Sequence, residues 1–209
     1  TALPDSFGDL AALEGLDLQR NRLRALPECF GQLTALQTLD VQFNRLTALP
    51  DAFGRLRALR RLHMQHNELA TLPPTFGQLS ALQVLDAQRN KLATLPEALG
   101  QLQALQTLDL NMNQLRRLPA SLSGLLALQA LHLQQNAQLA RLPLGFGQMS
   151  SLQVLDLQRG GLSSLPDSFS ELASLQVLDV QYNQLAGLPP GFGNLRGLQR
   201  LQVQHNRLE

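Results

Sequence analysis

Residues 36–46 read LQTLDVQFNRL, and this stretch decides the fold because the chain repeats its pattern from end to end. The motif LxxLxLxxNxL occurs nine times, once with Gly in place of Asn, beginning at Leu13, Leu36, Leu59, Leu82, Leu105, Leu128, Leu152, Leu175 and Leu198. A tract of the type LPxxFGxLxx precedes each copy, and the copies lie 23 residues apart with one step of 24. A fixed period of this length indicates a solenoid, in which each coil contacts only its neighbours.

Each repeat is expected to contribute one short strand. In the second repeat, the segment Leu39-Asp40-Val41 alternates apolar and polar side chains, which is typical of a strand with one buried face. Successive strands should stack in parallel about 4.8 Å apart, with Leu39 and Val41 inward. Asn44 follows at the turn, where its amide is expected to bond the backbone of neighbouring coils. Equivalent asparagines lie at positions 21, 67, 90, 113, 136, 183 and 206.

The other half of each repeat predicts turns rather than long helices. Pro50 and its equivalents interrupt regular structure, and Phe53 is expected to fill the space behind the leucines. This column contains Phe7, Phe30, Phe53, Phe76, Leu99, Leu122, Phe146, Phe169 and Phe192. The sequence therefore predicts an α/β solenoid of leucine-rich repeats. Its parallel β-sheet should line the concave face of an arc, with short 3₁₀ or irregular turns on the convex face.

One region departs from the period. The sixth repeat carries an extra residue between Asn136 and Pro143, and the seventh has Gly160 where the others have Asn, followed by Gly161. We expect a bulge here, with low protection from hydrogen exchange across residues 135–162. A harmless variation in length is the alternative reading.

Composition limits the function classes. The formal net charge is +1 and only 16% of residues are charged, so no strong field attracts nucleic acid or lipid. The apolar runs are shorter than a membrane helix requires, and no signal peptide is visible. The single cysteine, Cys29, cannot form an internal disulfide, and Asn-x-Ser/Thr is absent. These features favour a cytoplasmic location, including a host cytoplasm for a secreted effector. Residues 1–209 are expected to form one domain of about nine repeats, a fragment without dedicated caps.

The tract LPxxFGxLxxLQxLDxQxN resembles intracellular leucine-rich repeat proteins of the 23-residue, Ras-group type. Similar repeats occur in Roco GTPases, in scaffolds that bind small GTPases and in bacterial effectors of plant pathogens. The resemblance covers essentially the whole chain. It implies recognition of another protein through the concave face, with any catalysis carried by other domains. The alternative function is the targeting segment of a larger GTPase, kinase, ubiquitin ligase or secreted bacterial effector.

A longer period of three repeats is superimposed on the basic one. The outward slot after the fourth motif position reads Asp17, Asp40, His63, Asp86, Asp109, His132, Asp156, Asp179 and Gln202. The slot before the asparagine reads Arg20, Phe43, His66, Arg89, Met112, Gln135, Arg159, Tyr182 and His205. The pattern indicates duplication of a three-repeat block, or three similar subsites for a partner. A glutamine in nearly every repeat, such as Gln42, is interpreted as a structural ladder, with a platform for the partner as the alternative.

The same slots also bear on catalysis and metal binding. Adjacent aspartates such as Asp17 and Asp40 can share a proton in enzymes, but here Arg20 and its equivalents are expected to neutralise them. The row Asp40, His63 and Asp86 could converge on an ion, yet a flat sheet imposes no tetrahedral arrangement. We therefore expect no enzyme activity, no metal and no cofactor. The histidines leave open a binding reaction that changes near pH 6.

The expected partner is another protein, with no role for nucleic acid or membrane, and self-association through exposed ends or edge strands is an additional expectation. Interfaces favour aromatic, Met and Arg side chains, so Phe43 and Tyr182 are the main predicted anchors. The full set of predicted partner-binding residues is Arg20, Asp40, Phe43, Arg61, His63, His66, Asp86, Arg89, Asp109, Met112, His132, Arg159, Asp179, Tyr182, Arg200 and His205.

Overall fold

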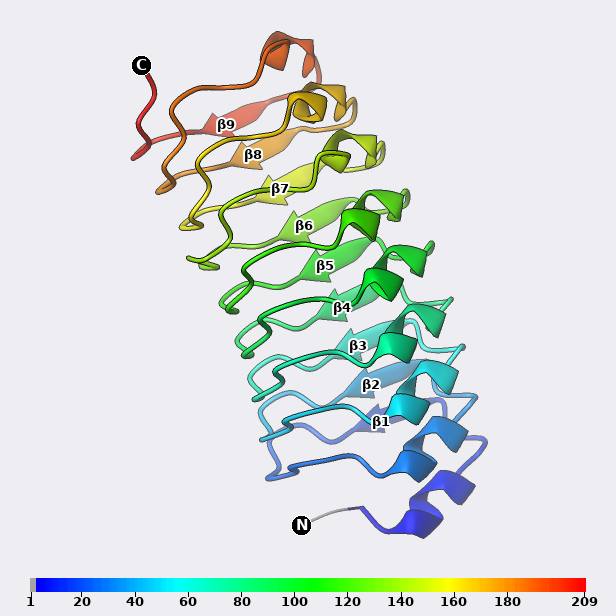
Figure 1. Ribbon diagram of the computed structural model, residues 1–209. Helices are drawn as coiled ribbons and strands as arrows, with labels where there is room; N and C mark the ends of the chain where they lie inside the picture. Colours follow the sequence, from blue (N-terminus) through cyan, green and yellow to red (C-terminus); the bar gives the residue numbers. More distant parts are fainter. Residues whose placement is uncertain (1–2) are drawn as a thin grey trace.

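The computed structural model describes residues 3–209, and across this range the chain winds into stacked coils that form one arc (Figure 1). Each coil contributes a three-residue strand: β1 (Gly15–Asp17), β2 (Thr38–Asp40), β3 (Arg61–His63), β4 (Val84–Asp86), β5 (Thr107–Asp109), β6 (Ala130–His132), β7 (Val154–Asp156), β8 (Val177–Asp179) and β9 (Arg200–Gln202). The strands pair in parallel in chain order, with equivalent residues in register, as Leu16 with Leu39. The predicted solenoid and its single parallel sheet are confirmed.

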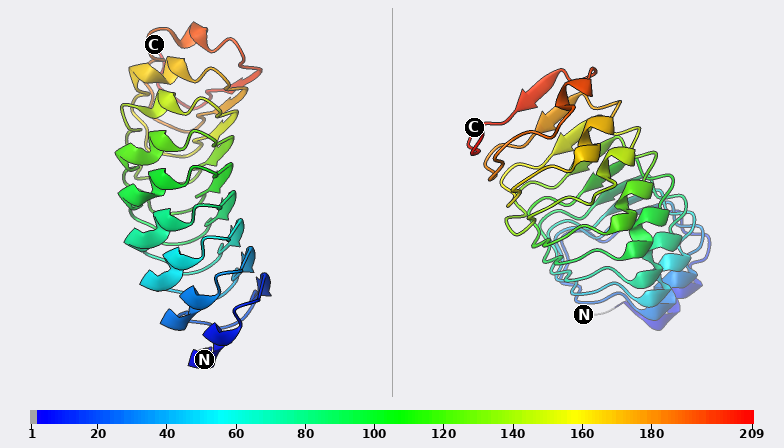
Figure 2. Two further views of the ribbon diagram at one scale, coloured as in Figure 1. Left: turned by 90° about the vertical axis from the view of Figure 1, so that its right-hand side faces the viewer. Right: turned by 45° about the horizontal axis from the view of Figure 1, so that its top comes forward.

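The opposite side of each coil carries a 3₁₀ turn, and Figure 2 shows these turns on the convex side, away from the strands. They are η1 (Asp5–Asp9), η2 (Glu28–Gln32), η3 (Asp51–Arg55), η4 (Pro74–Gln78), η5 (Glu97–Gln101), η6 (Ala120–Gly124), η7 (Phe146–Gln148), η8 (Asp167–Glu171) and η9 (Phe192–Asn194). Pro50 precedes η3 in an extended conformation, and its carbonyl accepts the N–H of Phe53 at 3.0 Å. The proline therefore marks the start of the turn and blocks its extension toward the N-terminus.

The core lies between the sheet and the turns. Inward leucines such as Leu39 and Leu62 are fully buried, and Phe30, Phe53 and Phe76 stack with ring centroids 6.1–6.2 Å apart. The predicted aromatic column is thus confirmed, and it continues through Leu99 and Leu122 to a second stack at Phe146. Burial of these rows fixes which face of the sheet remains outward.

A spine of asparagine amides connects the coils. In Asn90, Oδ1 accepts the N–H of Leu69 at 3.0 Å, while Nδ2 donates to the carbonyls of Met64 and Ala87. The neighbouring asparagines repeat this arrangement, and Asn67 also donates to the Met64 carbonyl while Asn113 also donates to the Ala87 carbonyl. Each of these carbonyls thus receives two amide donors, one from its own coil and one from the next.

The irregular region interrupts the asparagine spine, but a backbone hydrogen bond replaces the one that is lost. Leu139, whose N–H would otherwise reach the next coil's asparagine, donates to the backbone carbonyl of Asn136 at 2.9 Å. A Cβ on Gly160 would lie 2.8 Å from Oδ1 of Asn183, and one on Gly161 would lie 2.7 Å from the carbonyl oxygen of Ala137. The extra residue and the two glycines therefore form one coupled bulge. Its expected low protection from exchange remains a prediction.

Both ends of the described chain leave apolar side chains partly uncovered. Leu10 is 48% exposed at one end and Leu201 is 41% exposed at the other. Their equivalents in inner coils are buried, as Leu33 and Leu178 are, because a neighbouring coil covers each side.

Candidate functional site

The predicted partner-binding residues occupy three outward columns along the concave side. Arg61 and Arg200 begin their strands, and the aspartates and histidines from Asp40 to Asp179 end them. The third column comes three residues later, where N–H groups still bond across the coils, as Arg20 to the carbonyl of Gln42 at 2.9 Å. The columns are Arg61 and Arg200; Asp40, His63, Asp86, Asp109, His132 and Asp179; and Arg20, Phe43, His66, Arg89, Met112, Arg159, Tyr182 and His205.

Every residue of this third column has a left-handed backbone. The φ angles lie between 53° and 59° from Arg20 to His205, including Phe43 and Tyr182. A left-handed conformation costs a non-glycine residue roughly 1–2 kcal/mol. From Arg20 to Tyr182 the N–H of each residue in this row donates to the next coil, as that of Phe43 does to Gln65, and the same turn recurs at His205 in the last coil. Side chains of different types therefore stand in one row.

Two groups in this row form stacks of three side chains. The Phe43 ring stacks on His66 with ring centroids 4.2 Å apart, and Cζ of Arg20 lies over the Phe43 ring, 5.3 Å from its centroid. Tyr182 repeats the arrangement with His205 at 4.2 Å and with Arg159 at 4.9 Å.

These stacks correct one expectation. Arg20 and Arg159 were expected to neutralise the aspartates, but cation–π contact holds their guanidinium groups over the aromatic rings instead. The neighbouring side chains cover parts of both rings, yet Phe43 remains 39% exposed and Tyr182 42% exposed. Both predicted anchors therefore keep part of their ring surface accessible beside the stacked Arg and His side chains.

The histidine of the first stack, His66, has a shifted pKa. Burial lowers the pKa of His66, and the positive charge of Arg89 lowers it further, against a smaller opposing effect of Asp86. His66 is thus held in its neutral form to a lower pH than a free histidine, which suits stacking on Phe43.

The aspartate column has a structural role that the sequence interpretation missed. Asp40 Oδ1 accepts the N–H of Gln42 at 3.0 Å, and Oδ2 accepts the Gln42 side-chain amide at 2.8 Å. Asp179 holds Gln181 in the same way. Such turns are common for aspartate, whose carboxylate readily bonds the backbone two residues on. The recurring D-x-Q spacing was the signal that could have indicated it.

Two central aspartates have pKa values above the usual range. Burial raises the pKa of Asp109 and of Asp156, against the lowering effect of the backbone N–H two residues on. The neighbouring carboxylates Asp86 and Asp179 add to the increase. Asp109 and Asp156 therefore hold their protons more readily than Asp17 in β1, where hydrogen bonds from Gln19 lower the pKa.

The predicted glutamine ladder is continuous only in the first three coils. Gln65 Nε2 donates to Gln42 Oε1 at 2.8 Å, and Gln42 Nε2 reaches Gln19 Oε1 at 3.3 Å. Further along, the amide of Gln158 turns to the carboxylate of Asp179 at 3.3 Å. The side chains of this column thus bond to one another or to the aspartates, rather than forming one uninterrupted row.

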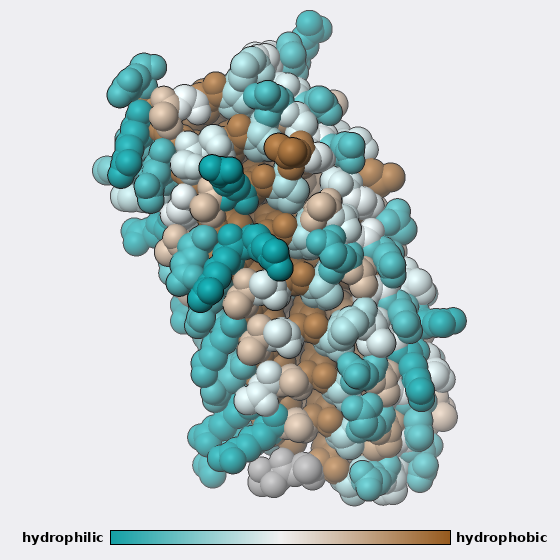
Figure 3. Space-filling view, viewed as in Figure 1, coloured by the Kyte–Doolittle hydropathy of each residue, from teal (hydrophilic) through white to brown (hydrophobic). Residues whose placement is uncertain are grey.

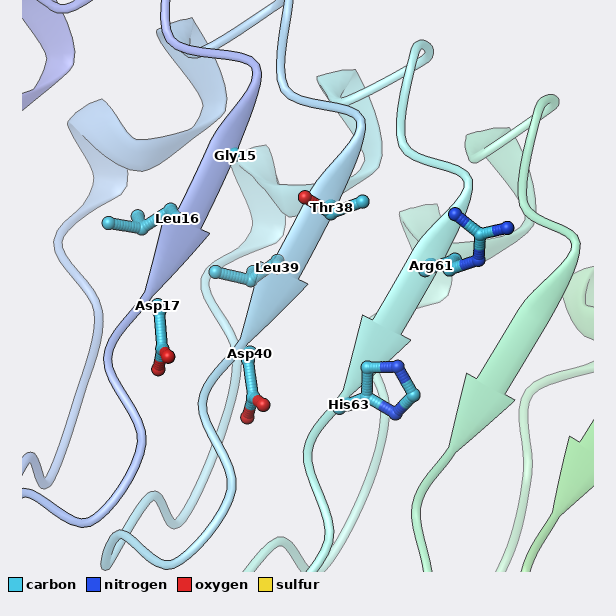
Figure 4. Close-up of a pocket in the computed structure, with 8 residues that line it drawn as sticks. All are labelled: Gly15, Leu16, Asp17, Thr38, Leu39, Asp40, Arg61 and His63. Carbon is cyan, nitrogen blue, oxygen red and sulfur yellow. The ribbon is translucent and has the colours of Figure 1, made fainter.

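A shallow hollow of about 300 Å³ lies on the concave sheet where β1, β2 and β3 meet. Figure 4 shows Thr38 and Arg61 at one end, with Asp17, Asp40 and His63 in a row at the other. Leu16 and Leu39 lie between the two rows, and Gly15 contributes no side chain. Asp40, Arg61 and His63 were all predicted partner-binding residues, and the structure brings them together here.

Neither a metal-binding cluster nor a membrane-spanning helix occurs in the part of the chain that the structure describes. Residues 3–209 contain no group of three or more His, Cys, Asp or Glu that could hold a metal ion. Within that range the helical segments are 3₁₀ turns of at most five residues, and none is long and apolar enough to cross a membrane. Figure 3 shows the side that carries these turns, where an apolar stripe runs along the arc between hydrophilic margins.

Comparison with known families identifies the fold. A sequence model described as "Leucine-rich repeat region" matches residues 3–91 and 85–160, and one described as "Leucine rich repeat" matches residues 150–208. The chain therefore belongs to the leucine-rich repeat family. A search of curated proteins finds no significant match.

Solved structures place the chain among several leucine-rich repeat proteins. A protein of Leptospira interrogans is 35% identical with a TM-score of 0.92, covering 99% of this chain and 52% of its own. The leucine-rich repeat domain of the type III effector XopL is 26% identical with a TM-score of 0.88, covering 98% and 73%. The Toll–Spatzle complex of Drosophila matches at 26% identity and a TM-score of 0.80, covering 98% and 28%. The chain thus spans about half the length of the Leptospira protein.

Proposed function

We propose that this protein is a non-enzymatic recognition module that binds another protein through its concave sheet. The observation that carries the proposal is the pair of Arg–aromatic–His stacks. The middle block builds the same strands and spine with Met112 in the aromatic position, where no ring contact forms. The fold therefore does not require exposed rings at Phe43 and Tyr182, and partly exposed aromatic and Arg side chains are frequent hot spots of protein interfaces.

The arrangement of the two stacks favours a partner that is engaged at two places. Tyr182 lies six strands beyond Phe43 in a sheet whose strands are spaced about 4.8 Å apart, so the stacks are separated by roughly 29 Å. A flat or elongated protein surface spans such a distance, whereas a small ligand does not. The Toll–Spatzle complex supports a protein partner for this fold. A single cysteine and the lack of glycosylation sites support action inside a cell.

The test is affinity capture with a matched control. A Phe43→Ala, Tyr182→Ala double variant should bind a specific partner with at least about tenfold lower affinity. This is expected when hot-spot side chains that contribute more than about 1.4 kcal/mol are removed. The control carries Leu126→Ala and Leu144→Ala, which remove side chains 51% and 87% exposed outside the concave sheet. Unchanged capture by the double variant, with its circular dichroism intact, would refute the proposal.

A second candidate is the targeting segment of a larger enzyme or secreted bacterial effector. The match to the repeat domain of the type III effector XopL favours it, because 98% of this chain aligns with that domain and covers 73% of it. Both candidates use the same concave surface. The complete reading frame distinguishes them, since only the second requires an enzymatic domain on the same polypeptide.

A further inference from the structure

Gly15 contributes open space to the hollow on the concave sheet. Gly15 begins β1, and every equivalent position in the later strands bears a side chain: Thr38, Arg61, Val84, Thr107, Ala130, Val154, Val177 and Arg200. A Cβ at Gly15 would meet only Thr38 Oγ1 within 4 Å, at 3.1 Å, and the backbone is not left-handed. Neither the turn nor a close backbone approach therefore demands glycine here. Because Gly15 has no side chain, it leaves open space on the sheet.

The two ends of this space differ in charge. Asp17 and Asp40 are paired across β1 and β2, and both project from the same ends of their strands (Figure 4). Hydrogen bonds from the Gln19 backbone and side chain hold the Asp17 carboxylate in place, and the same groups of Gln42 hold Asp40. A carboxylate offers about four lone-pair sites, so each retains acceptor capacity after two bonds. Two carboxylates against one guanidinium, that of Arg61, leave the hollow with net negative charge.

The dimensions fit a long basic side chain. The row that contains Thr38 and the row that contains Asp40 are two residues apart along the strands, about 6.6 Å at the parallel rise of 3.3 Å per residue. An extended lysine side chain places Nζ about 6 Å from Cα, given five bonds of roughly 1.5 Å each. Its alkyl stem would then cross β1 and β2 between the two rows, above the inward side chains of Leu16 and Leu39.

We propose that this hollow receives a lysine or arginine side chain of the protein partner, with the cation between Asp17 and Asp40 and the main-chain carbonyl toward Arg61. This deepens the proposed function and rests on it. The equivalent place in β7 and β8 is filled by Val154 and Val177, so the partner's basic residue enters at the β1 end. The hollow thus fixes the direction in which the partner lies along the two stacks.

The test is a titration of the whole chain with N-acetyl-lysinamide, followed by amide chemical shifts in NMR spectra. N-acetyl-norleucinamide, with the same stem and no cation, is the control ligand. Saturable shifts at Gly15, Asp17 and Asp40 with the lysine probe alone are the expected result. Equal shifts with both probes, or no saturable shift with the lysine probe, would overturn the proposal.

Variants of the protein complete the test. Gly15→Val fills the hollow with a residue that this column already accommodates, and Asp40→Asn removes charge while keeping an acceptor for the Gln42 N–H. Each should weaken lysine binding at least about tenfold, as expected for loss of a charge-assisted bond. Ala130→Val, in the same column of β6, should leave it unchanged. Undiminished binding in folded Gly15→Val contradicts the proposal. Partner capture through Phe43 and Tyr182 is a separate measurement, so it would still stand.

Discussion

The gap in the asparagine spine makes its flanking amides unequal. Asn90→Ala would orphan the N–H of Leu69, but the carbonyls of Met64 and Ala87 would keep donors from the adjacent asparagines. Asn136 has no such support on one side because Gly160 occupies the next position of the spine. Within the described residues, the carbonyl of Leu133 accepts only from Asn136, at 2.8 Å.

The structure therefore ranks the substitutions. Asn136→Ala removes the acceptor of the Leu115 N–H and the donor to the Leu133 carbonyl, leaving two buried polar groups unsatisfied. At about 1–3 kcal/mol per group, the loss is about 2–6 kcal/mol, against about 1–3 kcal/mol for Asn90→Ala. Asn21 is exposed and bonds no N–H of another coil, so Asn21→Ala should cost less than about 0.5 kcal/mol.

Urea unfolding followed by circular dichroism measures these differences, with the slope checked for loss of cooperativity. Hydrogen exchange should show faster opening at residues 135–162 than in the regular coils of the unsubstituted protein. If Asn136→Ala lowers the free energy of unfolding no more than Asn90→Ala does, then the single donor to the Leu133 carbonyl does not matter and the ranking is refuted. Equal protection across all coils would refute the expected weakness of the bulge.

Three other tests address the pH dependence, the convex turns and the ends. Because the pKa of Asp109 is raised on folding, its protonation favours the folded state below the unfolded pKa of about 3.9, and this contribution is lost as the pH rises through the folded pKa. Asp109→Asn should therefore stabilise the protein at pH 7 but not at about pH 3, and urea midpoints that show no gain at pH 7 would contradict this. Gly147→Ala should cost about 1–3 kcal/mol in thermal unfolding because its Cβ would collide with the Ser168 carbonyl, whereas Gly187→Ala, with open space around it, should be neutral. Leu201 is exposed at the last strand, so the mass in light scattering should rise with protein concentration, and Leu201→Lys should reduce this rise. A monomeric mass over about a hundredfold dilution would contradict self-association.

The sequence was sufficient for everything that the repeat period determines. Leu39, Phe53 and Asn44 are each set by their place in a coil, and a column of identical residues must stack when coils stack. Their burial and partners followed from the pattern alone, as did the 3₁₀ turns after each proline.

The outward surface was harder to predict because its side chains choose among several neighbours. The sequence placed Arg20 near both Asp17 and Phe43, and the structure shows that its guanidinium lies over the Phe43 ring. It also gave no hint that Phe43 would adopt a left-handed backbone, since local preference opposes it and the cross-coil ladder overrides that preference. The hollow at Gly15 depends on the absence of a side chain, which a motif search does not register.

Exceptions to the period separate structural from functional positions. Asn111 replaces the usual glutamine, and its Oδ1 accepts the Gln134 N–H that an aspartate would otherwise bind, because His132 stands there instead. At Gly160 the asparagine side chain is missing, and the Leu139 N–H donates instead to the backbone carbonyl of Asn136 in the bulge. Both exceptions are balanced by a second residue, as expected when the fold alone constrains them. Gly15 has no such compensation: nothing around it requires glycine, and a valine is accommodated at three equivalent positions. Gly15 thus departs from the repeat pattern without a compensating contact, and it opens a charged hollow on the exposed sheet. A ligand explains this better than the fold does, and ligand binding by the Gly15→Val variant tests the explanation directly.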